Sequence, residues 1–280
     1  MAREMHRLPR MNLLVLLAPL LTVAPAALHP GDAGLVTVRD VATAPTAAKA
    51  GGQRLACFPT AKGYEALFAV PLDVNEDHIL VEDAGTEPVT VPIAAKHFAD
   101  TSVIVEDELA NPPAADRATI DADNAAITAA YAKANGAPQF KHAFKRPPGA
   151  VTSPFGEWRT FNDGHRSQHL GLDLLAREGS PVAAVNDGTV ALVRSTFLAG
   201  NVVVIAHGGG ISSLYFHLSK TGVAEGDVIA RGQVIGRAGH TGRTTGPHLH
   251  VSIHVPGGMV DPAQFFALPI APSPLSTASR

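Results

Sequence analysis

Histidine and aspartate recur at even spacing in the second half of the chain. One stretch runs from His169 to Asp173 with Leu170-Gly171-Leu172 between them, and a later one ends in His248-Leu249-His250. On an extended strand, residues two apart project from the same face, so His248 and His250 share a face, as do His169 and Asp173. Two imidazoles and one carboxylate are a common zinc ligand set that leaves a fourth position to water. The spacing therefore indicates a hydrolytic zinc site.

A third stretch, Tyr215-Phe216-His217-Leu218, lies between the other two and carries a single histidine. Eight of the thirteen histidines fall between His165 and His254. A lone histidine in a strand is more often a surface or core residue than a ligand. The ordered set of His169, Asp173, His217, His248 and His250 is the part of this concentration that points to chemistry.

Charge and composition indicate a globular protein without a nucleic-acid partner. The 280 residues suffice for two domains or one large one. Residues 27–147 carry 10 basic and 16 acidic side chains, and residues 148–280 carry 9 and 8. Neither segment has the basic surface of a nucleic-acid binder. Cys57 is the only cysteine, which excludes an intrachain disulfide, and we interpret it as a small buried core residue.

The first 26 residues have the pattern of a signal peptide. Three arginines precede an apolar run from Leu13 to Val23, and Ala24-Pro25-Ala26 supplies small residues for cleavage. The apolar run is short for a membrane span. We therefore expect cleavage after Ala26, export to the periplasm or the extracellular space, and no stable membrane insertion afterwards.

The rest of the chain predicts a mainly β protein in several parts. Residues 27–50, rich in Ala, Pro, Thr and Gly, are expected to be a flexible lead-in, although Gly34–Asp40 alternates. Residues 51–110 hold short apolar runs separated by acidic or glycine-containing turns, which is typical of a small antiparallel β domain. Residues 111–147 form a helix and linker, with the helix over 115–134.

Pro147-Pro148-Gly149 marks the next boundary. From there to residue 268 we expect a second domain built as an antiparallel β-sheet or partly open barrel, and residues 269–280 are expected to be a flexible tail. The whole chain is thus predicted to be mainly β, with a small β domain and one connecting helix before the zinc domain.

Residues 149–266 resemble the lysostaphin-type, or β-lytic, zinc metalloendopeptidases, which cut bacterial cell-wall peptides. The matching stretches occur in family order: Thr152–Gly156, Gly179–Ala184, Gly188–Val190, Asn201–Ile205, Gly232–Gly236 and Gly239–His250. The resemblance implies one zinc ion per chain, bound by His169, Asp173 and His250. It also implies that His217 and His248 are catalytic without binding the metal. A neutral histidine can accept a proton and a protonated one can stabilise an oxyanion, and the sequence leaves open which does which.

Two positions depart from the family pattern. Ser252 stands where the family often has an acidic residue, so the surroundings of the last ligand are expected to differ. His240 stands where serine is commoner. We interpret His165, His207, His240 and His254 as surface or loop residues.

The function implied is hydrolysis of peptide bonds in peptidoglycan by an exported zinc endopeptidase. The alternative is a non-catalytic regulator or binding module of other cell-wall hydrolases, as some relatives that have lost ligands are. A structural β protein with incidental histidines is the third possibility. All five site positions are present, which favours the enzyme. The substrate expected is a peptidoglycan peptide; no protein partner, oligomeric state or substrate-binding residue can be named. A further hypothesis is that residues 27–147 restrict access to the zinc.

Overall fold

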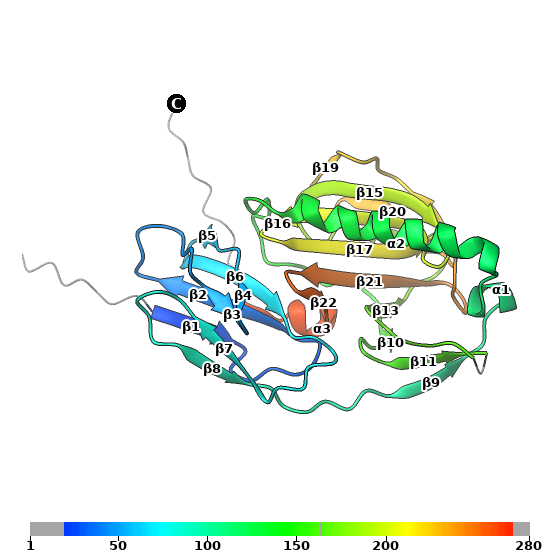
Figure 1. Ribbon diagram of the computed structural model, residues 1–280. Coiled ribbons are helices and arrows are strands. Elements are labelled where there is room, and N and C mark those ends of the chain that lie inside the picture. Colours follow the sequence, from blue (N-terminus) through cyan, green and yellow to red (C-terminus); the bar gives the residue numbers. More distant parts are fainter. Residues whose placement is uncertain (1–19, 163, 271–280) are drawn as a thin grey trace, which may run out of the picture.

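The computed structural model describes residues 20–162 and 164–270, and these are mainly β-strands, as predicted (Figure 1). The largest sheet has eight strands, and every pair in it is antiparallel. In spatial order they are β10 (Val151–Ser153), β13 (Leu172–Leu175), β21 (His248–Val255), β17 (Ile211–Leu218), β16 (Gly200–Gly208), β15 (Gly188–Thr196) and β19 (Val228–Ile229), with β22 (Gly258–Val260) beside β21. The order is open from β10 to β19.

Two small sheets adjoin the large one. One consists of β14 (Pro181–Ala183), β20 (Val234–Arg237) and β18 (Lys220–Thr221). The other consists of β12 (Arg166–Gln168), β11 (Trp158–Phe161) and β9 (Asp100–Val103), with β9 parallel to β11. Because β9 comes from the first half of the chain, this sheet joins the two halves beside β13.

The first half of the chain forms two four-stranded sheets. One has the order β1 (Leu20–Ala24), β2 (Ala33–Arg39), β6 (Gly63–Ala69) and β5 (Phe58–Thr60). The other has the order β4 (Gln53–Arg54), β3 (Lys49–Ala50), β7 (His78–Glu82) and β8 (Val89–Pro92). A short helix, α1 (Asp107–Ala110), follows β9.

Strand β2 corrects the expectation that residues 27–50 are a flexible lead-in. The strand is buried along nearly its whole length and lies between β1 and β6. Leu35 packs in the core shared with the large sheet, whereas Val36 and Val38 pack in a second cluster with Val81. The strand is buried because both of its faces meet apolar layers, a condition that composition does not reveal.

The two halves of the chain share their main hydrophobic core. Leu35, Phe58 and Leu67 of the first half pack in one cluster with Tyr215 and Val251 of the large sheet. The backbone N–H of Ala69 also donates to Pro256, 2.9 Å away. The Pro-rich boundary near residue 148 therefore separates two segments of sequence that fold against each other.

Helix α2 (Arg117–Tyr131) lies across the opposite face of the large sheet (Figure 1). Short 3₁₀ turns at 114–116 and 132–134 extend it, so the helix covers the range expected from the sequence. Ile127 and Ala130 pack on Leu192 and Val204 of β15 and β16. Within the described part of the chain, no helix combines the length and apolarity that crossing a membrane requires.

The two ends of the chain lie partly outside the described residues. Of the expected signal peptide, residues 1–19 are not described, and Leu20–Ala24 form β1, which pairs with β2. Of the expected tail, residues 271–280 are not described. Ile270 is 5% exposed and belongs to the main core, so a tail that begins at 269 is wrong at that position. The α3 helix (Pro262–Phe265) anchors this end through the buried Phe265.

Candidate metal centre

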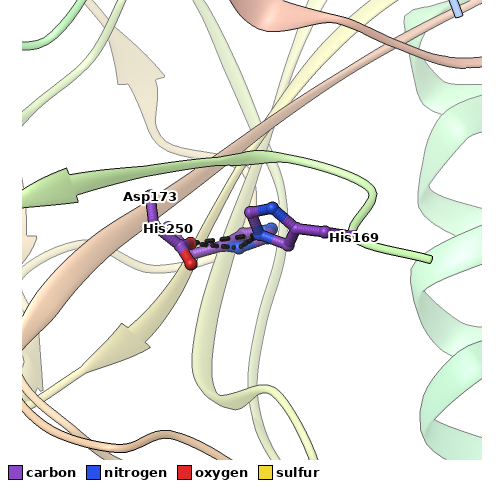
Figure 2. A group of neighbouring side chains, drawn as sticks. All are labelled: His169, Asp173 and His250. Atoms are coloured by element: carbon purple, nitrogen blue, oxygen red, sulfur yellow. Dashed lines mark hydrogen bonds and ion pairs between the residues drawn. The ribbon is translucent and has the colours of Figure 1, made fainter. Parts of the chain in front are cut away.

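Asp173 and His250 are direct cross-strand partners on β13 and β21. Leu172 and Leu174 point into the main core, so Asp173 projects from the opposite face. His169 precedes β13, where its backbone N–H donates to Glu157 and its carbonyl accepts from Gly156, both at 2.8 Å. This backbone pairing turns the His169 ring toward Asp173 and His250, as Figure 2 shows.

Three electron-pair donors meet in this cluster, and all three residues are buried. His169 Nε2 lies 3.0 Å from His250 Nδ1 and 3.2 Å from Asp173 Oδ1, and His250 Nδ1 lies 2.8 Å from Asp173 Oδ1. His169 Nδ1 donates to the Pro154 carbonyl at 2.8 Å, so its Nε2 carries a lone pair when the ring is neutral. Lone pairs on atoms this close repel one another unless a cation lies between them.

A zinc ion fits this arrangement. Three atoms separated by 2.8–3.2 Å can all lie at the zinc–ligand distance of about 2.0–2.1 Å from one point. Two neutral imidazoles and a carboxylate are also the donor types that zinc accepts, and a single proton could satisfy only one pair of them. The geometry therefore favours a divalent cation over a simple hydrogen-bond cluster.

Ser252 contacts the ring of His250 from the side away from the cluster. Its Oγ lies 2.8 Å from His250 Nε2, and both side chains project from the same face of β21. When Nε2–H donates to this hydroxyl, Nδ1 is free to bind the cation. A neutral serine thus orients the last ligand at the position where an acidic residue was expected from the family pattern. Phe216 stacks on the face of the same ring, with 4.9 Å between centroids.

Gly171 leaves the space that the His250 ring occupies. A Cβ at this position would lie 2.3 Å from His250 Nε2 and 2.6 Å from Ser252 Oγ. Residues 169, 171 and 173 project toward the same side, so any side chain between the two ligands would displace the third. The glycine in His169–Asp173 is therefore part of the site, and spacing alone gave no sign of this.

His217 reaches the site through a β-bulge. Asn201 pairs with Leu218 and Val203 with Tyr215, so β17 holds one more residue than β16 in this interval. His217 itself has φ of 59°, a left-handed conformation that non-glycine residues rarely adopt. In a regular strand it would point with Tyr215 into the core. The bulge turns it to the face of His250, whose ring centroid lies 5.9 Å away.

His217 and His248 line one groove of about 630 Å³ together with Asp173. Their ring centroids are 5.0 Å apart. His217 Nδ1 donates to the Thr241 carbonyl at 2.8 Å, and His248 Nδ1 donates to the Gly246 carbonyl at 2.9 Å. Each ring therefore presents its Nε2 atom to other partners, and His248 Nε2 lies 3.5 Å from Asp173 Oδ1.

Electrostatics separate these two histidines. Burial, together with positive charge on His250 and His248, lowers the pKa of His217 to about 3, although the Thr241 carbonyl and the charge of Asp173 act in the opposite direction. Burial also acts to lower the pKa of His248, but the hydrogen bond to Asp173 and its charge outweigh burial and raise that pKa. For Asp173 itself, burial acts to raise the pKa, and the neighbouring rings of His169, His248 and His250 bring it well below its usual range. His217 is therefore neutral and Asp173 ionised.

Arg159 holds the second oxygen of Asp173. Its Nη2 donates to Asp173 Oδ2 at 2.6 Å, which leaves Oδ1 facing the histidines. Arg159 Nε donates to Glu157 at 3.2 Å, and Thr101 Oγ1 of β9 donates to the same carboxylate at 2.7 Å. The first half of the chain is thus linked to a metal-ligand candidate through two intervening side chains.

Residues 101–105 also line the groove that contains these histidines. That residues 27–147 restrict access to the metal stays a prediction. Residues 101–105 are the part of that segment that would do so, because they line the groove.

Sequence reasoning missed Arg159 and misjudged another histidine. A single arginine in a predicted strand has no spacing signal, because its partner Asp173 lies on a different strand. His207, expected on the surface, is 0% exposed on β16. Its Nδ1 donates to the backbone carbonyl of Asp187 at 2.7 Å, and its Nε2 lies 2.8 Å from Ser213 Oγ. Its position inside the sheet, rather than in a turn, explains the error.

The other three histidines interpreted as surface or loop residues, His165, His240 and His254, do not line the groove. His165 is exposed, and His240 lies 3.3 Å from Glu178 on the surface. His254 stacks on Tyr131 of α2, with 3.9 Å between ring centroids, and is therefore half-buried rather than a free surface residue.

The segment that holds the candidate site also matches a known protein family. Residues 167–262 match peptidase family M23. The chain carries an M23 peptidase domain. The match runs from the residue two before His169 to the start of α3, so it includes all five candidate site residues.

Curated relatives match through this half of the chain. The DD-carboxypeptidase/endopeptidase Mpg of Neisseria meningitidis is 42% identical over 120 residues, which are 42% of this chain and 27% of Mpg. The peptidoglycan DD-endopeptidase ShyA of Vibrio cholerae is 46% identical over 93 residues, or 33% of this chain and 22% of ShyA. The chain thus matches only about a quarter of the length of these relatives.

One solved structure extends the likeness to the first half. It is the crystal structure of a protein assigned to peptidase M23 from Pseudomonas aeruginosa, with a TM-score of 0.63 and 28% identity. The alignment covers 85% of this chain and 94% of that one. The arrangement of β modules before the M23 domain is therefore shared with another protein.

Proposed function

We propose that this chain is an exported, zinc-dependent endopeptidase that hydrolyses peptide bonds in the stem peptides or cross-links of peptidoglycan. The observation that carries the proposal is the convergence of His169, Asp173 and His250 on one point at the edge of an open groove. Of the relatives that match the same segment, Mpg is named as a DD-carboxypeptidase/endopeptidase and ShyA as a peptidoglycan DD-endopeptidase.

His169, Asp173 and His250 would hold one zinc ion through Nε2, Oδ1 and Nδ1. When bound, zinc lowers the pKa of a coordinated water and polarises a carbonyl group. Arg159 keeps Asp173 Oδ1 turned toward the metal position, and Ser252 fixes the ring of His250. The chain's contribution to the metal is therefore both the ligands and their orientation.

The two remaining histidines divide the proton transfers. His217 Nε2 is unprotonated, since Nδ1–H donates to Thr241 and burial keeps the ring neutral, so it accepts the proton of the attacking water. His248 has its pKa raised by Asp173, so its Nε2–H is available to stabilise the oxyanion and to protonate the leaving amine. The geometry supports His217 as the base and His248 as the acid.

Glycan hydrolysis is disfavoured by the state of the groove's carboxylates. Cleavage of a glycosidic bond normally needs one carboxyl group that stays protonated beside a second that is ionised. Glu157 and Asp173 both accept hydrogen bonds from Arg159. Burial acts to raise the pKa of Glu157, but bonds from Ser153, Thr101 and Arg159 lower it overall. Neither carboxyl can serve as the acid.

Digestion of purified cell wall by the zinc-loaded protein tests the reaction. New amino groups are expected to rise while reducing sugar ends stay constant, and sequencing the freed termini identifies the bond. Chelated protein and the Asp173→Ala variant are the controls. A rise in reducing ends without new amines would overturn the proposal.

Export is proposed from the sequence of residues 1–26 and is tested by the first residue of the exported protein. Cleavage after Ala26 makes Ala27 the first residue. It would also remove β1 and leave β2 as an edge strand of its sheet. Recovery of the uncleaved chain from the cytoplasm alone would contradict export.

A further inference from the structure

Arg243 lies over an aromatic ring at the edge of the groove. It belongs to the loop between β20 and β21, where its backbone N–H donates to Leu198 at 2.7 Å. Its guanidinium carbon is 4.0 Å from the centroid of the Phe161 ring. Arg243 and Phe161 line the same groove as His217 and His248. The cation is therefore held in place beside the residues proposed to carry out hydrolysis.

This guanidinium lacks a counter-ion within residues 20–162 and 164–270. No carboxylate of those residues lies within 4.0 Å of it, its side chain forms no hydrogen bond with them, and the aromatic ring beneath it is that of Phe161. Burial lowers the pKa of Arg243, and the positive charge of Arg159 lowers it further. A half-buried cation with a like charge nearby is costly, and an anion in the groove would relieve that cost.

The other charges of the groove are already matched. Its charged lining residues are Glu157, Arg159, Asp173 and Arg243. Arg159 contacts both carboxylates, and Asp173 is also a proposed ligand of a dication. With zinc bound, the groove carries an excess of positive charge, and among the charged lining side chains that the structure describes Arg243 is the one without an ion-pair partner.

We propose that Arg243, stacked on Phe161, binds a free carboxylate of the peptide that is cut. This inference rests on the proposed peptidase function. A guanidinium presents a planar fork of N–H donors that matches a carboxylate with two parallel hydrogen bonds. The Phe161 ring beneath the guanidinium helps to hold the fork in place. A carboxylate bound to it would set how the peptide lies relative to His217 and His248. The carboxylate is either an acidic side chain or the carboxyl terminus of the peptide.

A second arginine in the same part of the fold provides a matched control. Arg166 lies 4.2 Å from the centroid of the Trp158 ring, but it is paired with Asp100 and lies outside the groove. Arg166→Met therefore removes a cation from an aromatic ring without touching the proposed carboxylate site.

The experiment compares wall peptides with free carboxylates against the same peptides after amidation. Two further synthetic peptides are amidated only at the acidic side chain or only at the carboxyl terminus, which identifies the carboxylate. Cleavage by the zinc-loaded full chain is expected to fall about 10- to 100-fold on amidation, the range for a hydrogen bond to a charged group. Arg243→Met should show the same fall on free peptides and none on amidated ones. Arg243→Lys, which keeps the charge but loses the fork, should lie between them.

Equal losses of Arg243→Met on both peptide forms, or a matching loss in Arg166→Met, would overturn the inference. Titration calorimetry with the same peptides separates this inference from the proposed function. If the wild type cuts neither form, the peptidase proposal fails. The carboxylate site then stands only if the wild type binds the free form more tightly than the amidated one and Arg243→Met does not.

Discussion

Buried histidines with polar partners occur at two places in the large sheet, and only one of them forms a candidate site. His207 on β16 and His250 on β21 are both buried, and both ring nitrogens of each have polar partners. At His207 each ring nitrogen has its own partner: Nδ1 contacts the Asp187 carbonyl and Nε2 contacts the Ser213 hydroxyl. At His250 one nitrogen faces Asp173 and His169 together, beside a groove.

The difference is the direction of the lone pairs. Both nitrogens of the His207 ring are occupied by hydrogen-bond partners. The ring also lies among core residues, with Phe144 edge-on at 5.2 Å between centroids, so no ligand can reach it. The His250 cluster directs three acceptors to one point. Burial and hydrogen bonding are therefore common to a structural histidine and a ligand, whereas convergence of donors beside open space distinguishes the ligand.

The largest expected effect is the loss of the converging set. Asp173→Ala or His250→Ala removes one of three ligands, and zinc per chain should fall from about one to none after dialysis. Turnover should fall below detection. Elemental analysis and cell-wall digestion measure the two outcomes, with His207→Gln as the buried-histidine control that keeps its zinc. Full zinc content in Asp173→Ala would show that the cluster is not the metal site.

The next effect separates the catalyst from the ligands. His217→Ala should keep its zinc and lose about two to four orders of magnitude in kcat, because proton transfer is lost while the ligands remain. Zinc content and kcat are measured on the same preparation. Release of zinc from this variant would make His217 a ligand and contradict the division of roles.

Gly171 tests whether the convergence depends on free space. Gly171→Ala places a Cβ 2.3 Å from His250 Nε2, so the ring must shift and zinc affinity should fall about 5- to 150-fold, the equivalent of about 1–3 kcal/mol of overpacking. Gly246→Ala is the control, since no atom lies within 4 Å of the added Cβ. Competition with a chelator measures the affinity. Equal affinity in the two variants would remove Gly171 from the site.

Arg159 tests the residues behind the ligands. Arg159→Met frees Asp173 Oδ2 and leaves Glu157 without its cation, and zinc affinity should fall about 10- to 100-fold, as for other groups that orient ligands. Arg159→Lys should restore part of this loss. A Met variant with wild-type affinity but reduced turnover would place Arg159 in substrate binding instead.

The smallest effect concerns His207 and stability. Burial lowers the pKa of His207 to about 4, whereas an unfolded histidine has a pKa near 6.5. Between these values the unfolded chain binds a proton that the folded chain does not, so stability falls as pH falls, by up to about 1.4 kcal/mol per pH unit. The excess stability of the wild type over His207→Gln should therefore shrink from pH 7.5 to pH 4.5. Denaturant unfolding at several pH values measures it, and a constant difference would contradict the assignment.

The sequence by itself determined the features that depend on local backbone geometry. The two-residue period of a strand fixed that His248, His250 and Ser252 share one face, and the helical period with its flanking breakers fixed the helix near residues 115–134. The ordered motifs also indicated the family from residues 149–266 alone. These features need only the geometry of one element.

Tertiary structure decided what depends on how distant strands align. Asp173 meets His250 because β13 and β21 pair in that register, and Arg159 reaches Asp173 from a different sheet. His217 faces the groove only because an extra residue in β17 reverses the alternation that would send it into the core. Strand β2 and His207 are buried because layers from elsewhere in the chain cover them. Register, bulges and burial arise from pairing and packing between segments far apart in sequence, and the residue pattern of any one segment does not contain them.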